Sequence, residues 1–215
     1  MEALIITNDR SLARLVQVSP RKSVAEAHRT RDAIVERAVD VASKEGLEGL
    51  TIGRLAGDLD MSKAGLIGHF GSKERLQLAA LEAATERFRS EVWEPVKDQE
   101  PGLGRLRALC EAWVAYLEKP VFPGGCFFAA AATEFDDRSG PVRELLASGA
   151  RRWRRRLERD ARAAVDAGDL PPDTDSAQLA TDLNGVMLSL NHDLMLLRDP
   201  EAPARARRAM RRLLA

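Results

Sequence analysis

Residues 46–76 constrain the fold more than any other stretch, because they predict two short helices and the start of a third with only tight breaks between them. Thr51, Ser62 and Ser72 each precede an apolar segment with helical periodicity. A hydroxyl at such a position accepts a hydrogen bond from a free amide in the first helical turn. Asp60-Met61 forms the break between the two short helices. Two helices joined in this way form the unit that places its second helix in the major groove of DNA.

The segment before this stretch predicts a longer helix over residues 31–45. Gly46 suits the left-handed position that follows a helix. The apolar positions of the segment recur at helical spacing and would pack against the two short helices; they are Ile34, Val35, Ala38, Val41 and Ala42. The sequence therefore predicts a three-helix head over residues 30–76.

These residues resemble the DNA-binding head of TetR-family transcriptional repressors. The resemblance runs from about Thr30 to Leu81, and its most specific part is the block His69-Phe70-x-Ser72-Lys73-Glu74-x-Leu76. The rest of the chain resembles the family only in length and helical character. The resemblance implies a dimeric one-component regulator, released from a palindromic double-stranded DNA operator by a small, mostly apolar ligand.

DNA contacts are predicted partly from the residues and partly from this resemblance. Phosphates are held by positive side chains and by amides at helix N-termini, and the resemblance places Thr51, His69 and Lys73 at phosphate-contacting positions. A packing role fits His69 equally well, and a solvated surface position is the alternative for Lys73. The full predicted set is Thr51, Ser62, Lys63, Ala64, Gly65, Gly68, His69 and Lys73.

The groove-facing helix departs from the family pattern at two positions. Ile67 stands where the family usually has a tyrosine that reaches a phosphate, and Gly68 stands where the family usually has a large side chain. Lys63 is then the only long donor for a guanine edge. Two interpretations follow: the helix approaches the bases closely and reads DNA shape, or the head binds DNA weakly and the regulator acts through a protein partner.

Residues 1–29 do not fit the head. One interpretation is a partly ordered tail. The other is an arm whose basic side chains touch the DNA backbone or minor groove; these are Arg10, Arg14, Arg21, Lys22 and Arg29.

Residues 77–215 predict an all-α domain, and the resemblance implies that this domain binds an effector and dimerises. Helices are expected from Ser72 to about Trp93, over 103–118, over 126–135, from Gly140-Pro141 onward, from 173–175 to about 198, and over 202–214. By resemblance, the last two helices form an intersubunit four-helix bundle. The arginines between residues 151 and 162 predict a solvated face paired with Glu158 and Asp160, and the alternative is a second DNA surface.

A ligand site within these helices is implied by the resemblance. Asn184 and Asn191 stand out because they interrupt an apolar stripe seven residues apart, and buried asparagines need a ligand, a second subunit or a backbone group as partner. His192 is expected at the subunit interface. The apolar candidates fit core positions as well. The candidates are Trp113, Tyr116, Cys126, Phe127, Phe128, Glu134, Phe135, Asn184, Met187 and Asn191.

Composition limits the remaining function classes. The formal net charge is +0, so DNA binding must come from a local patch. No apolar run is long enough to span a bilayer, and the N-terminus makes a poor signal peptide, so we expect a cytoplasmic protein. Cys110 and Cys126 have no metal-ligand spacing, and no cofactor is predicted. An all-helical enzyme is the weaker alternative, because no catalytic motif is present.

Overall fold

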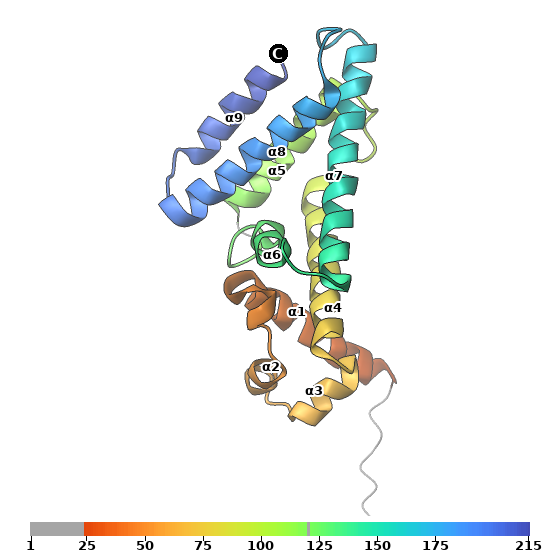
Figure 1. Ribbon diagram of the computed structural model, residues 1–215, viewed down its shortest axis with the longest axis vertical. Coiled ribbons are helices and arrows are strands. Elements are labelled where there is room, and N and C mark those ends of the chain that lie inside the picture. Colours follow the sequence, from red (N-terminus) through yellow and green to blue (C-terminus); the bar gives the residue numbers. More distant parts are fainter. Residues whose placement is uncertain (1–23, 120) are drawn as a thin grey trace, which may run out of the picture.

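The computed structural model describes residues 24–119 and 121–215, and every regular element in this part of the chain is helical. The molecule is elongated, with the head at one end of its long axis (Figure 1). The proposed arm residues Arg10, Arg14, Arg21 and Lys22 lie outside the described residues. Arg29, in contrast, belongs to the first helix, α1 (Val24–Gly49), which begins before the predicted helix start at residue 31.

The head consists of α1, α2 (Ile52–Asp58), α3 (Lys63–Phe70) and the first turn of α4 (Lys73–Phe88). The predicted stripe of α1 is buried. The predicted end of α1 at Gly46 is a break, with φ 79° and ψ 164°, after which the helical turn continues to Gly49. Asp60 also has a positive φ of 52°, and the amide of Met61 donates to the carbonyl of Ala56 at 2.9 Å. This turn sets the angle between α2 and α3.

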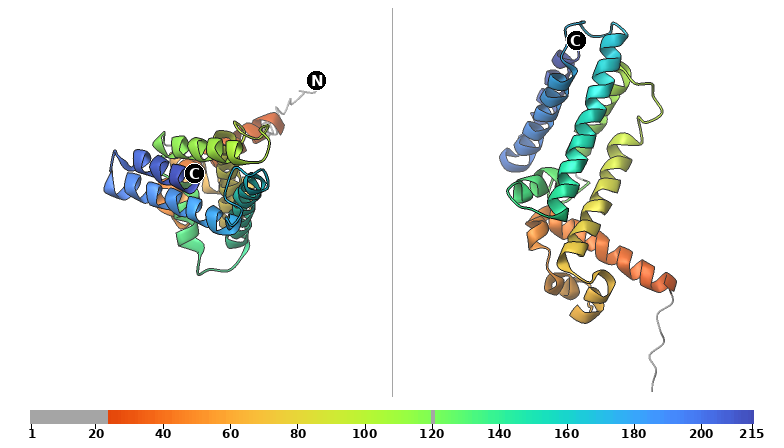
Figure 2. Two further views of the ribbon diagram at one scale, coloured as in Figure 1. Left: turned by 90° about the horizontal axis from the view of Figure 1, so that it is seen from above. Right: turned by 45° about the vertical axis from the view of Figure 1, so that its right-hand side comes forward.

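The C-terminal domain is built around the long helices α4 and α7 (Pro141–Asp166), which run along the long axis (Figures 1 and 2). α5 (Leu103–Glu118), α8 (Ser176–His192) and α9 (Ala202–Leu213) pack together at the far end from the head. The short helix α6 (Phe127–Phe135) lies between this layer and α1. The predicted helices are therefore confirmed to within a few residues.

The structure contains two π-helical segments that the sequence did not predict. π-helical turns follow α4 at η1 (Arg89–Trp93) and α8 at η2 (Asp193–Leu197). Single π turns inside longer helices are often found at functional sites. No helix of the described residues combines the length and apolarity needed to cross a membrane.

Candidate nucleic-acid interface and effector site

The outer face of α3 carries the predicted groove-facing residues. Lys63, Ala64, Gly65 and Gly68 are exposed, as is Ile67, whose exposed fraction is 43%. Leu66 and Phe70 are buried against the rest of the head. The helix is therefore fixed by its inner face, and its outer face is small and open. A Cβ added at Gly68 would meet nothing within 4 Å, so its missing side chain leaves free space for another molecule.

Three hydroxyls cap the helices of the head as predicted. Thr51 accepts from the amide of Arg54 at 3.2 Å, Ser62 from Gly65 at 3.0 Å and Ser72 from Arg75 at 3.1 Å. Each bond satisfies a backbone donor that the first helical turn leaves free. Thr51 and Ser62 are thus structural caps at the helix ends where phosphate contacts were predicted. Each hydroxyl oxygen already accepts a hydrogen bond from a backbone amide of its own helix.

Three basic side chains of the head, Arg37, Arg54 and Lys73, are paired with acids. Lys73, a predicted phosphate contact, donates to the carbonyl and a carboxylate oxygen of Glu48, at 2.9 and 3.1 Å. This hydrogen bond to Lys73 lowers the pKa of Glu48. Asp58 binds both Arg37 and Arg54. Lys73 therefore joins α4 to the end of α1, and these two bonds leave one of its three ammonium donors for another acceptor.

Lys63 remains available for DNA, because it forms no ion pair within the described residues. Arg75, which sequence reasoning missed, is also exposed and unpaired within the same part of the chain. Its position three residues after the Ser72 cap, in the first turn of α4, was the signal that could have revealed it. His69 is half-buried beside the ring of Phe70, with the ring centroids 6.4 Å apart, which fits the packing interpretation. The Arg31 guanidinium lies 5.1 Å from the centroid of the same Phe70 ring.

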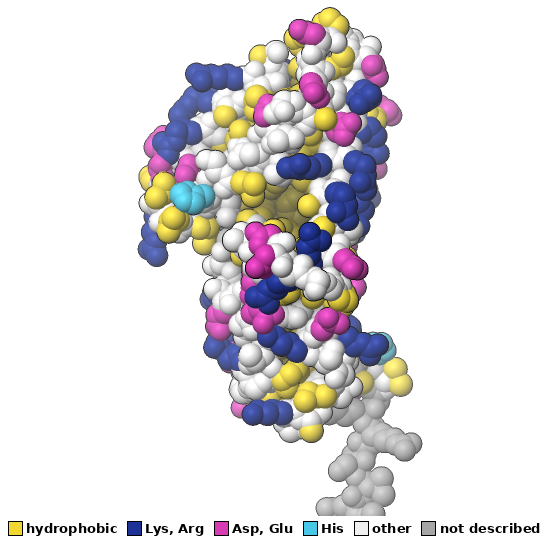
Figure 3. All heavy atoms as spheres, viewed as in Figure 1, with side chains coloured by type: hydrophobic (Ala, Val, Ile, Leu, Met, Phe, Trp, Pro, Cys, Tyr) yellow, Lys and Arg dark blue, Asp and Glu magenta, His cyan; other side chains and the backbone are white. Residues whose placement is uncertain are grey.

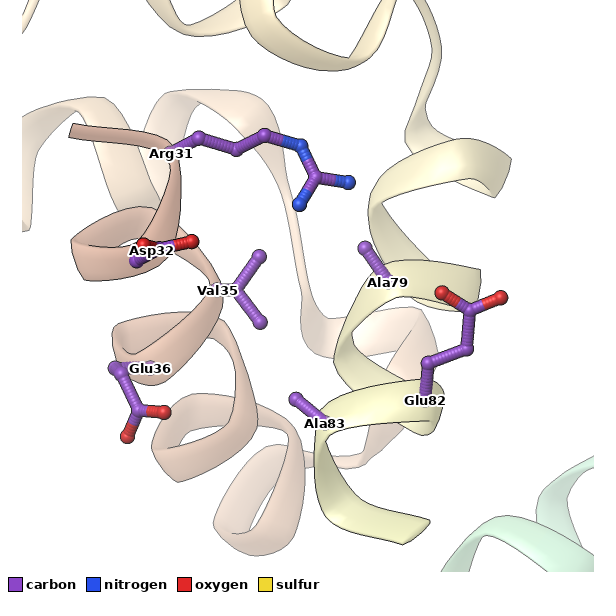
Figure 4. Close-up of a pocket in the computed structure, with 7 residues that line it drawn as sticks. All are labelled: Arg31, Asp32, Val35, Glu36, Ala79, Glu82 and Ala83. Carbon is purple, nitrogen blue, oxygen red and sulfur yellow. The ribbon is translucent and has the colours of Figure 1, made fainter. Parts of the chain in front are cut away.

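A pocket of about 280 Å³ lies between α1 and the middle of α4 (Figure 4). Val35, Ala79 and Ala83 form its apolar wall, and Arg31, Asp32, Glu36 and Glu82 surround it. None of the predicted effector residues lines it. A second pocket of about 400 Å³ lies between α5 and the end of α9, and none of the predicted effector residues lines it either.

The predicted ligand residue Glu134 has a different role. Its two carboxylate oxygens accept hydrogen bonds from the backbone amides of Leu47 and Glu48, each at 2.7 Å. The carboxylate therefore replaces the helical partners that the break at Gly46 removes. A Cβ at Gly46 would stand 2.9 Å from both oxygens, so glycine is required both by the positive φ and by this contact.

Further contacts connect the end of α1 to α4 and to the segments around α6. The buried Gln77 of α4 donates to the carbonyl of Leu47 at 2.8 Å, and Arg138 pairs with Glu48 at 3.0 Å. A Cβ on Gly124 would lie 1.7 Å from the carbonyl oxygen of Ser43, so the loop before α6 packs directly on the α1 backbone. We refer to the contacts of residues 46–48 with α4 and α6 as the joint.

Five aromatic rings from four helices meet inside the C-terminal domain. Phe88 at the end of α4 is central: its ring centroid lies 5.0 Å from Trp153, 5.2 Å from Tyr116, 5.6 Å from Phe128 and 6.2 Å from Trp113, in edge-on arrangements. Trp113 and Tyr116 come from α5, Phe128 from α6 and Trp153 from α7. We call these five residues the aromatic cluster. Sequence reasoning selected Trp113, Tyr116 and Phe128 as ligand candidates, but not Phe88 and Trp153.

The other predicted ligand residues do not join this cluster through ring contacts with Phe88. Phe127 is buried against Phe122, and Phe135 and Met187 are also buried. The side-chain oxygen of Asn191 accepts from the amide of Cys126 at 2.9 Å, so a backbone group is its partner. Asn184 is half-buried and makes no hydrogen bond within the described residues. His192 is exposed beside Asp193, with 58% of its side chain accessible.

The basic face of α7 differs from the prediction at two residues. Asp160 is fully buried and forms a two-pronged ion pair with the buried Arg105 of α5, at 2.5 and 3.0 Å. Arg156 covers the ring of Trp93, with its guanidinium carbon 3.6 Å from the centroid. Arg162 pairs with Glu158 as predicted, and the remaining arginines of the run are exposed.

The two thiols are shielded. Burial raises the pKa of Cys110 to about 12, and burial also raises the pKa of Cys126. A raised pKa lowers the fraction of reactive thiolate at neutral pH. No group of His, Cys, Asp and Glu within the described residues could hold a metal ion.

The fold is shared with solved regulators. A structure of a TetR transcriptional regulator from Chloroflexus aurantiacus J-10-FL aligns with a TM-score of 0.79 at 24% identity, covering 86% of this chain and 94% of that one. A structure of AibR in complex with isovaleryl coenzyme A and operator DNA aligns with a TM-score of 0.67 at 21% identity, covering 84% and 95%.

The sequence comparisons agree with the fold. The HTH-type transcriptional regulator SrpR of Pseudomonas putida is 25% identical over 183 residues, which are 85% of this chain and 83% of SrpR. The family model for bacterial regulatory proteins of the tetR family matches residues 34–80. The model for the tetracyclin repressor-like C-terminal domain matches residues 102–210, about half of the chain. The chain therefore belongs to the TetR family of DNA-binding transcriptional regulators.

Proposed function

We propose that this regulator is a dimeric repressor that binds a two-fold-symmetric operator through the exposed face of α3, and that a small, mostly apolar effector in the C-terminal domain releases it. The joint is the observation that carries this proposal. It connects the head to both α4 and α6, so a shift of either helix also moves the head. An effector that prefers the shifted arrangement would change the spacing of two heads and weaken binding to two half-sites.

Lys63 and Arg75 are the proposed cationic contacts with DNA, and the helix ends capped by Thr51 and Ser62 supply amides near the phosphates. Ala64, Gly65 and Gly68 allow close approach to the bases, and His69 supports Phe70. Lys73 already binds Glu48, and it would contribute through its remaining ammonium donor or by exchanging Glu48 for a phosphate.

Dimerisation is proposed through α8 and η2. The apolar side of α9 already packs within the chain, since Ala202, Pro203, Ala206 and Met210 are buried. Large apolar side chains are nevertheless exposed on the outer side of α8 and η2: Leu188 at 52%, Met195 at 43%, Leu196 at 69% and Leu197 at 61%. Such a group of exposed apolar residues is typical of an interaction surface. Leu188→Asp should convert the dimer to a monomer in sedimentation, whereas Val24→Asp, at another exposed apolar position, should not.

DNA binding is tested by fluorescence anisotropy with duplexes from upstream of the gene, at several salt concentrations. The proposal expects sequence-selective binding with a steep salt dependence, because phosphate contacts release counterions. Lys63→Ala should weaken binding by about 10-fold, in line with the loss of one base or phosphate contact. Lys44→Ala is the matched control, because Lys44 is also an exposed lysine but lies on α1 instead of α3.

One observation favours a second candidate function. Ile67 is 43% exposed on the outer face of α3, where it presents an apolar surface. A regulator that uses this face for a protein partner instead of DNA would show no selective duplex binding, including in a selection from genomic fragments. Ile67→Tyr, which introduces the side chain usual in the family, would then create DNA binding, and under the repressor proposal it would only strengthen it.

A further inference from the structure

Two polar atoms of the aromatic cluster lack a hydrogen-bond partner. The hydroxyl of Tyr116 and the indole Nε1 of Trp153 are both buried, and neither is paired within the described residues. The Cys126 thiol interacts with the Tyr116 hydroxyl, but a thiol is too weak a donor and acceptor to satisfy a buried hydroxyl. A buried polar group without a partner destabilises the fold. These two atoms therefore require an explanation.

We propose that the aromatic cluster is the effector site and that it binds a neutral, single-ring aromatic molecule whose hydrogen-bond acceptor is held by Tyr116 and Trp153. This inference rests on the proposed function, because it assigns the ligand class of the same effector domain. The two helices that carry Phe128 and Trp153, α6 and α7, border an apolar hollow together with α8 (Figure 3). Phe88, Phe128 and Trp153 are only partly buried, whereas Trp113 and Tyr116 are buried.

The chemistry of the two atoms selects an acceptor. An indole N–H can only donate, and burial raises the pKa of Tyr116, so its hydroxyl stays a neutral donor. Carbonyl, ether and nitro oxygens on an apolar molecule fit both. A quaternary ammonium could bind to aromatic faces, but it would leave Nε1 unpaired. The one carboxylate among the predicted ligand residues, Glu134, already accepts from the amides of Leu47 and Glu48.

The position of Phe88 sets the size of the ligand. Its ring packs edge-on against the rings of both Tyr116 and Trp153. A ligand ring that takes this place would meet the same aromatic neighbours and reach the two free donors. Phe88 is the last residue of α4 before the π turn η1, and the first turns of α4 carry Lys73 and Gln77 at the joint. Displacement of Phe88 is thus a route from ligand binding to the head.

Three probes of similar size test the proposal: acetophenone, ethylbenzene and phenyltrimethylammonium. Binding to the full-length protein without DNA is measured by isothermal titration calorimetry. Acetophenone should bind about 10-fold more tightly than ethylbenzene, because only the ketone pairs the buried donors. Tyr116→Phe and Trp153→Phe should each reduce this preference to about 3-fold or less. Trp93→Phe, a tryptophan outside the cluster, should leave it unchanged.

Phe88 variants provide the second measurement. Phe88→Leu should bind acetophenone more tightly than the unmodified protein, since the competing ring is gone and an apolar cavity remains. Phe88→Ala should do so more strongly if it folds, and the leucine variant keeps the test valid if it does not. Equal binding of acetophenone and ethylbenzene, tighter binding of phenyltrimethylammonium, or no binding of any probe to Phe88→Leu overturns the inference.

Failure of this inference can be separated from failure of the proposed function. Operator binding without preference for acetophenone would overturn only the ligand assignment. Preference for acetophenone without selective DNA binding would support the site and overturn the proposed function.

Discussion

In the head, the hydroxyls of Thr51, Ser62 and Ser72 each accept a hydrogen bond from a backbone amide, whereas in the aromatic cluster the hydroxyl of Tyr116 has no partner within the described residues. All four oxygens belong to side chains of similar polarity. The difference is that the caps are exposed and paired, while the tyrosine is buried and unpaired. The capping hydroxyls of the head thus have their hydrogen-bond partners, whereas the Tyr116 hydroxyl of the aromatic cluster lacks one.

General looseness of the C-terminal domain does not explain this contrast. Its fully buried Asp160 forms two short hydrogen bonds with Arg105, and Arg105 also donates to the carbonyl of Gln99 at 2.8 Å. The domain therefore pairs its most costly polar groups. Tyr116 and Trp153 are exceptions within their own region, which is the pattern expected of a ligand site rather than of a defective core.

The largest loss in the free energy of unfolding is expected when the buried ion pair between Asp160 and Arg105 is broken. Asp160→Ala leaves the buried guanidinium of Arg105 without its carboxylate, and breaking a buried pair in this way costs about 3–5 kcal/mol. The free energy of unfolding from urea denaturation measures this loss. Glu158→Ala, which removes an exposed partner of Arg162, is the control and should cost less than about 1 kcal/mol. Equal effects of the two variants would show that the buried pair is not important.

The joint between the two regions gives the next largest effect. Glu134→Ala removes the carboxylate that binds the amides of Leu47 and Glu48, and charge-assisted hydrogen bonds of this kind contribute about 1.5–3 kcal/mol. Hydrogen exchange should accelerate at those two amides, and the free energy of unfolding should fall. Thr133→Ala, the exposed neighbour on α6, is the control. Unchanged exchange at Leu47 and Glu48 would contradict the assigned role of Glu134.

Within the head, removing a helix-capping hydroxyl should lower the stability of the protein. Ser62→Ala leaves the amide of Gly65 without its acceptor, and such changes cost about 1 kcal/mol. Thermal unfolding should show a lower midpoint, while Ser90→Ala, an exposed serine in η1, should leave the midpoint unchanged. If Ser62→Ala were neutral, water would satisfy the amide as well as the hydroxyl does.

Local features were predictable from the sequence. The positions of the caps and the bounds of α5 and α6 follow from short-range rules on hydroxyls, apolar spacing and glycine. The burial of Asp160 also left a signal, because residue 160 lies three positions after Leu157 and four before Ala164, on the apolar stripe of α7. The stripe was recognised, but the aspartate was assigned to the solvated face because charged residues are usually exposed.

Contacts between distant segments were not predictable. Glu134 and its partner Leu47 are 87 residues apart, so no local pattern links the carboxylate to the break at Gly46. The aromatic cluster combines rings from four helices, and helical periodicity shows only that Phe88 and Trp153 face inward. The pairing of Lys73 with Glu48 depends on the packing of α1 against α4, which the sequence does not specify, whereas Arg54 pairs locally with Asp58 four residues later.

The smallest expected change in the free energy of unfolding tests the comparison between the head and the aromatic cluster most directly. Its sign is expected to be opposite to that of the cap variant. Tyr116→Phe removes an unpaired buried hydroxyl and keeps the ring, so the free energy of unfolding should stay the same or rise by up to about 1 kcal/mol. Ser62→Ala removes a paired hydroxyl and should lower it. Both variants are measured by urea denaturation under the same conditions. If Tyr116→Phe destabilised as much as Ser62→Ala, the tyrosine hydroxyl would have a partner in solution, and neither the contrast between the two regions nor the proposed acceptor site would stand.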